Sequence, residues 1–236
     1  MKRETLTRFG FYIAGLLILA LGLISNTKAG LGVSPIISVS YSAATIWNFN
    51  FGNAVFVQYS IFVAAELLLH ALLYLRQRRL GKKDSLNLKR VFLMDILQLP
   101  LSLVFTRFMN LFSLYLPDFS GSALPQRILV LLIAIALTGI GAAMSLNMRL
   151  VPNPGDGIVQ TISDFAGKKV GFTKNCFDAF NITAAILVGL ACTGTLVGVG
   201  LGTVCAVIGV GRVIALFNHI FGKQLLSLSG LPQSNP

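Results

Sequence analysis

Hydrophobic residues occur along this chain in long runs that short polar segments separate. A helix needs about 20 apolar residues to cross the hydrocarbon core of a bilayer. The runs that reach or approach this length predict six spanning helices, at 8–27, 52–75, 91–114, 127–148, 172–192 and 196–220. The pattern therefore predicts an all-α fold, a polytopic transmembrane helix bundle, with 1–236 forming a single integral membrane domain.

Two weaker segments interrupt this pattern, at 35–47 and 154–166. Each has about 13 residues, too few to cross a bilayer unaided, and each is rich in Ser, Thr, Gly or Asp. We expect two short non-spanning helices here, either re-entrant or interfacial.

Composition agrees with a membrane protein and excludes a soluble one. Hydrophobic residues make up 55% of the chain and charged residues 11%, whereas soluble domains carry about 25% charged residues. The formal net charge of +11 comes mostly from segments between the apolar runs, where basic residues set orientation and contact anionic lipid. The expected partner is therefore the lipid bilayer, and nucleic-acid binding is not expected. The three cysteines have no metal-ligand spacing, so neither a metal nor a cofactor is predicted.

The distribution of charge predicts the topology. The segment 76–90 is strongly basic, and Lys2, Arg3 and Arg8 make the amino terminus basic. Basic segments favour the cytoplasmic side, so six crossings with both termini cytoplasmic satisfy most of the markers, in a bacterial cytoplasmic membrane. If the short segments also crossed, an eight-span arrangement would place 76–90 outside, against the rule.

An internal repeat relates the two halves of the chain, 8–114 and 127–220. A shift of 119 residues aligns four pairs without a gap: Arg8 with Arg127, Gly22 with Gly141, Pro35 with Pro154 and Gly52 with Gly171. Each half has three crossings, an odd number, so the halves would have inverted orientations. Such a 3+3 inverted repeat with interrupted helices is a common plan of secondary transporters. The alternative is a duplication that serves only packing.

The two points where the weaker segments begin, called the breaks below, are candidate binding elements. Ser34 precedes Pro35, and Asn153 precedes Pro154, a pattern typical of a capped helix start. The free N–H groups of such a start suit a polar or anionic ligand, although Asp156 would weaken an anion site. The alternative is a pair of interfacial turns.

Charged residues inside the predicted spans need a partner or a function because burying a charge in a bilayer is costly. Glu66 and Asp178 are candidates for ion or proton coupling. Arg212 is expected at a similar depth and could pair with either acid. Arg107, its counterpart in the first half, is a candidate for binding a substrate anion, helix carbonyls or lipid phosphate.

Other motifs have simpler interpretations. The small-residue stripe Gly194, Gly198, Gly202 and Ala206 predicts close packing of the last spanning helix. No Ser-His-Asp set converges on one predicted site, so the chain offers no catalytic residues and is not expected to be an enzyme.

The chain resembles the YczE/YyaS/YitT-like family of bacterial membrane proteins over nearly its whole length. The most specific matching segments are 29–35, 97–102, 154–159 and 197–203. The first departs from the commoner family form, because Ile36 and Ile37 stand where that form has Trp-Asp. The resemblance implies an integral membrane protein whose biochemical activity is not established.

Two functional hypotheses follow. The first is a small-solute transporter or permease, with a central site at the repeat interface between Pro35, Pro154, Arg107 and Arg212. The second is a membrane scaffold or regulatory protein that does not transport and acts through its basic cytoplasmic loop at 76–90. A homo-oligomer is compatible with either.

Overall fold

The computed structural model describes residues 3–79 and 87–232, and within them every regular element is a helix. Six helices are long and apolar enough to span a membrane, as predicted. They are α1 (Arg3–Lys28), α3 (Phe51–Arg79), α4 (Leu88–Tyr115), α5 (Leu124–Asn147), α7 (Val170–Thr193) and α8 (Leu201–Leu228).

Short helices form at both predicted breaks. The first break gives a 3-10 turn, η1 (Pro35–Ile37), followed by α2 (Ser38–Ile46), and the second gives α6 (Pro154–Ala166). Asn153 caps α6 as expected, because its side chain accepts a hydrogen bond from the Gly155 N–H. The expectation for Ser34 is wrong, since its side chain makes no capping hydrogen bond.

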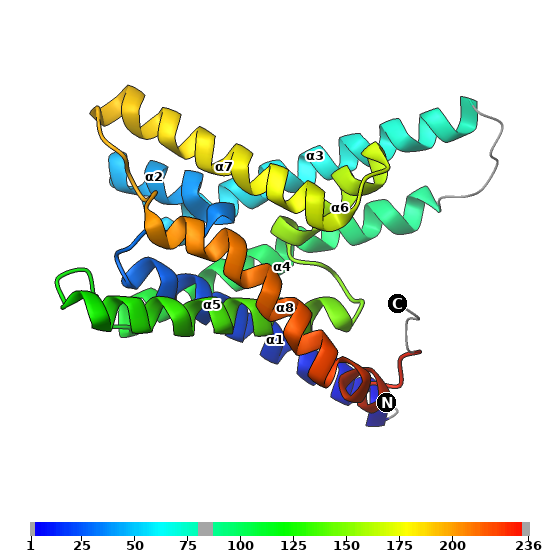
Figure 1. The fold of residues 1–236 in the computed structure, drawn as a ribbon. Coiled ribbons are helices and arrows are strands. Elements are labelled where there is room, and N and C mark those ends of the chain that lie inside the picture. Colours follow the sequence, from blue (N-terminus) through cyan, green and yellow to red (C-terminus); the bar gives the residue numbers. More distant parts are fainter. Residues whose placement is uncertain (1–2, 80–86, 233–236) are drawn as a thin grey trace.

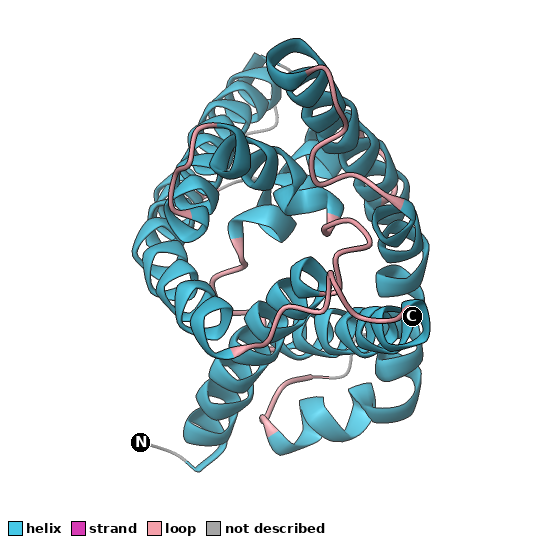
Figure 2. Cartoon of the chain, turned by 90° about the vertical axis from the view of Figure 1, so that its left-hand side faces the viewer, coloured by secondary structure: helices cyan, strands magenta, loops and turns pink. Residues whose placement is uncertain are grey.

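The long helices run roughly side by side, with both chain termini and the facing ends of α3 and α4 at one end of the molecule (Figure 1). Viewed along these helices, short helical segments and loops lie between the long ones (Figure 2). Each short helix packs against one long helix from each half of the chain. α2 contacts α3 and α7, and α6 also contacts α3 and α7.

The most extensive helix contact joins α1 to α5. Glycines allow this close approach: a Cβ added to Gly22 would lie 2.5 Å from the Thr138 nitrogen, and one added to Gly141 would lie 2.3 Å from the Leu19 nitrogen. Gly22 and Gly141 are 119 residues apart, as are Leu19 and Thr138. The two contacts are therefore equivalent under the sequence shift.

A second pair of contacts obeys the same shift. Arg8 donates from Nε to the Met148 carbonyl at 2.7 Å and from Nη2 to the Arg149 carbonyl at 2.9 Å. Arg127 donates from Nε to the Ala29 carbonyl at 3.1 Å and from Nη2 to the Gly30 carbonyl. Each arginine thus binds carbonyls at the C-terminal end of the helix that carries the other arginine, where cations are stabilising.

The start of the last spanning helix was predicted too early. α8 begins at Leu201 instead of residue 196, and Gly194 and Gly198 adopt φ angles of +69° and +72° in the preceding loop. These left-handed conformations suit glycine and end a helix. Only Gly202 and Ala206 of the predicted small-residue stripe therefore lie on α8.

Candidate functional site

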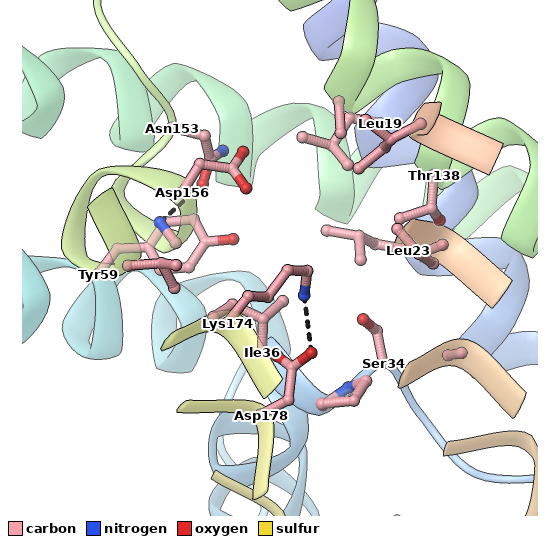
Figure 3. A pocket seen from close by; sticks show the side chains of 17 residues that line it. Leu19, Leu23, Ser34, Ile36, Tyr59, Thr138, Asn153, Asp156, Lys174 and Asp178 are labelled. Atoms are coloured by element: carbon pink, nitrogen blue, oxygen red, sulfur yellow. Dashed lines mark hydrogen bonds and ion pairs between the residues drawn. The ribbon is translucent and has the colours of Figure 1, made fainter. Parts of the chain in front are cut away.

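A small cavity lies at the centre of the bundle, beside the two chain breaks (Figure 3). Its volume is about 50 Å³, and a buried water needs only about 10–15 Å³ on this measure. Five pairs of lining residues are related by the 119-residue shift: Leu19 and Thr138, Leu23 and Ala142, Ser34 and Asn153, Ile36 and Gly155, and Tyr59 and Asp178. The cavity is thus built from corresponding positions of the two halves.

The polar side of this cavity comes from α6, α7 and the residue before η1. Asp178 is 1% exposed and accepts a hydrogen bond from Lys174 Nζ to Oδ2 at 2.7 Å, while its Oδ1 has no partner. The buried Asn153 side chain likewise uses Oδ1 and leaves Nδ2 without one. One acceptor and one donor are therefore unsatisfied on the cavity, which is costly for buried groups unless water or a ligand binds them.

Several of the predicted site residues share this cavity. Ser34, Pro35, Asn153, Asp156 and Asp178 all line it. Pro154 lies between two of these residues and occupies the first turn of α6.

Glu66 lies on a second cavity of about 230 Å³, formed where α3, α4 and α6 meet. Its Oε2 accepts a hydrogen bond from Gln98 Nε2 at 2.6 Å. In the same cavity His70 Nδ1 lies 2.8 Å from Asp95 Oδ2. Glu66 and Asp178, the two residues predicted to couple ions or protons, therefore line different cavities.

The two predicted arginines lie away from both cavities. Arg107 is exposed and donates from Nη2 to Asn53 Oδ1. Arg212 is exposed on α8 and has no hydrogen-bond or ion-pair partner among residues 3–79 and 87–232. The expected pairing of Arg212 with Glu66 or Asp178 is wrong, because Lys174 is the cation that binds Asp178.

Sequence reasoning missed three residues of these cavities. Lys174 stands four residues before Asp178, so the sequence did contain a signal for a pair on one helix face. His70 and Asp95 are 25 residues apart in the sequence, and only the packing of α3 against α4 brings them together. Tyr59 carries no sequence signal that separates it from other apolar aromatics.

Neither cavity offers a ready metal centre. In the described part of the chain, no three His, Cys, Asp or Glu residues are grouped so that they could hold a metal ion.

Comparisons with known proteins place the chain in a family. Residues 6–219 match the model of a family of unknown function, DUF6198. The chain is 27% identical over 243 aligned positions to the uncharacterized membrane protein YczE of Bacillus subtilis (strain 168), covering 98% of this chain and 99% of that protein. No solved structure matches. The chain therefore belongs to the DUF6198 family and is a YczE-like integral membrane protein.

Proposed function

We propose that this protein is a small-solute transporter of the bacterial cytoplasmic membrane, with its solute site in the central cavity. The observation that carries the proposal is the pair of unsatisfied buried atoms there, Asp178 Oδ1 and Asn153 Nδ2. Inside a membrane protein such groups are expensive and mark ligand or ion pathways. A bound solute that both donates and accepts hydrogen bonds would satisfy both.

The arrangement of the two halves supports transport over simple packing. Five pairs of cavity-lining residues, the α1–α5 glycine contacts and the Arg8 and Arg127 contacts obey the 119-residue shift. This is the pattern expected of a 3+3 inverted repeat with its site at the repeat interface and two short helices that stop within the membrane. Both termini would then lie on the cytoplasmic side, with the basic 76–90 segment.

Charge narrows the class of solute. Two carboxylates, Asp156 and Asp178, and one ammonium group, Lys174, line the cavity. The sequence suggested a polar or anionic solute, but an uncharged polar or cationic solute suits this balance of charges better than an anion, since like charges repel across a buried site. The volume of about 50 Å³ limits the solute in this conformation to a few non-hydrogen atoms.

Uptake into proteoliposomes tests the proposal. The probes are labelled methylammonium, urea, glycine and inorganic phosphate, and the variants are Asp178→Asn and Asn153→Leu. We expect at least one of the uncharged polar or cationic probes (methylammonium, urea or glycine) to accumulate. Each variant should lower the uptake of that probe at least tenfold. Arg212→Ala and Arg107→Ala lie off the cavity and are the matched controls, with uptake near that of the wild type.

The scaffold hypothesis makes the opposite prediction. If no probe accumulates, and deletion within the 76–90 segment abolishes the cellular phenotype while Asp178→Asn does not, the protein acts through its basic loop. Residues 80–86 of that segment lie outside the described residues.

A further inference from the structure

The second cavity contains a carboxylate whose hydrogen bonding is incomplete. Glu66 on α3 and Gln98 on α4 are each 1% exposed. Gln98 Nε2 donates to Glu66 Oε2 at 2.6 Å, but Glu66 Oε1 and Gln98 Oε1 have no partner. Both of these free atoms are acceptors when Glu66 is ionised, so neither could satisfy the other.

The two free oxygens face the same point. A Cβ added to Gly157 would lie 2.8 Å from Gln98 Oε1 and 2.8 Å from Glu66 Oε1. Both oxygens therefore lie on the side of the pair that faces α6, where Gly157 presents only a Cα.

The surroundings do not neutralise an ionised Glu66. The charged and titratable groups that line the same cavity are His70 on α3, Arg90 and Asp95 on α4, and Asp164 on α6. His70 is already bound to Asp95. Within the described residues, no lysine or arginine lies within ion-pair distance of Glu66. Burying an ionised carboxylate without a partner is unfavourable, so such a group takes up a proton instead.

We infer that Glu66 is a proton-binding site, in which a proton on Oε1 is shared with Gln98 Oε1. Gln98 then donates through Nε2 and accepts through Oε1, so acid and amide form a ring closed by two hydrogen bonds. One proton satisfies both unpartnered oxygens at once. A carboxylic acid donates in this way only while it is protonated.

The His70–Asp95 pair provides a route for exchanging this proton. Asp95 accepts from His70 Nδ1–H, which leaves Nε2 as an acceptor, and Thr161 Oγ1 lies 3.4 Å from Nε2. On release, the Glu66 Oε1–H bond breaks and water carries the proton to His70 Nε2, where an N–H bond forms. The product is an ionised Glu66 and an imidazolium paired with Asp95. A role in coupling rests on the proposed transport function, whereas proton binding itself does not.

Infrared spectroscopy of the full chain in lipid bilayers tests the inference without a substrate. The chain contains only two glutamates, Glu4 and Glu66, so uniform ¹³C-glutamate labelling confines the isotope shift to these residues. We expect a ¹³C-shifted carbonyl band of a protonated carboxylic acid at neutral pH. It should persist in Glu4→Gln and in the cavity control Asp164→Asn, and it should disappear in Glu66→Gln.

Two further measurements decide other outcomes. Gln98→Leu should shift the frequency of the band, because it removes both hydrogen bonds of the ring. Absence of any ¹³C-shifted acid band at neutral pH in the wild type would overturn the inference. A band that vanishes in Na⁺ but not in choline medium would show a sodium site instead. Because the wild-type and Glu4→Gln spectra together decide these outcomes, misfolding of Glu66→Gln leaves the test intact. An acid band without solute uptake would overturn only the transport proposal.

Discussion

At the scale of single residues, the buried polar groups divide into two sets with different chemistry. Lys174 and Asp178 form a charged pair on the central cavity, whereas Glu66 and Gln98 form an acid–amide pair on the second. In a membrane, both arrangements reduce the cost of burying a carboxylate, one by a cation and the other by a proton. Each can be disturbed separately.

Removing the cation should destabilise the fold. Lys174→Ala leaves both oxygens of the buried Asp178 without a partner, which should cost about 1–3 kcal/mol. Thermal unfolding in detergent checks this, with the exposed Lys168→Ala as a control that changes little. Adding Asp178→Asn to Lys174→Ala should recover part of the loss, because no buried charge remains. If Lys174→Ala unfolds at the same temperature as the wild type, the pair does not stabilise the fold.

A methyl group at Gly157 should separate α6 from the Glu66–Gln98 pair. A Cβ there would lie 2.8 Å from two buried oxygens, and overpacking of this kind costs about 1–3 kcal/mol. Gly157→Ala should therefore lower thermal stability. Gly171→Ala on α7 is the matched control, because its Cβ meets nothing within 4 Å, and it should be neutral or stabilising. Equal stability of the two variants would argue against the tight α6 contact.

At the scale of helices, hydropathy and capping chemistry accounted for most elements. The long apolar runs and the Asn153-Pro154 start appear in the structure as predicted. The start of α8 was predicted too early, because the residues around Gly194 and Gly198 are apolar. Hydropathy cannot distinguish such an apolar loop from the beginning of a spanning helix. The predicted capping role of Ser34 was also wrong, since Ser34 lines a cavity and its side chain makes no capping hydrogen bond to η1.

The crossing of α1 and α5 makes a paired prediction. Gly22→Ala and Gly141→Ala should destabilise the protein by similar amounts, because each Cβ would collide with backbone of the other helix at 2.5 Å and 2.3 Å. Gly10→Ala on α1 has open space and should be tolerated. Chemical unfolding in mixed micelles measures all three. A large effect at one glycine and none at its counterpart would contradict the equivalence of the two contacts.

At the scale of the whole molecule, the sequence indicated which backbone segments meet but not which charged residues line the cavity between them. Aligning Pro35 with Pro154 predicted that the breaks meet at the repeat interface, and residues beside both line one cavity. The placement of Arg107 and Arg212 away from it depends on helix rotation, which near-uniformly apolar spans do not encode. The i,i+4 spacing of Lys174 and Asp178 is visible in the sequence, but it does not show that the pair faces the cavity.

The proposed orientation can be tested by thiol labelling of intact cells. After Cys176, Cys192 and Cys205 are replaced by Ser, single cysteines at Asp118 and Arg79 report the two ends of the bundle. A membrane-impermeant maleimide should label Asp118→Cys only from outside and Arg79→Cys only after the membrane is opened. Labelling of both from the same side would exclude an inverted repeat.

The most direct test of the central claim asks whether the cavity opens to both sides of the membrane. Ser34→Cys and Asn153→Cys, in the same cysteine-free protein, replace equivalent buried residues on the cavity. A transporter predicts that a small impermeant thiol reagent reaches both positions from either face of sealed vesicles of known orientation. The control Ser102→Cys, fully buried on α4 but off the cavity, should stay unreactive. Failure of both cavity positions to react from either face would contradict the transport account.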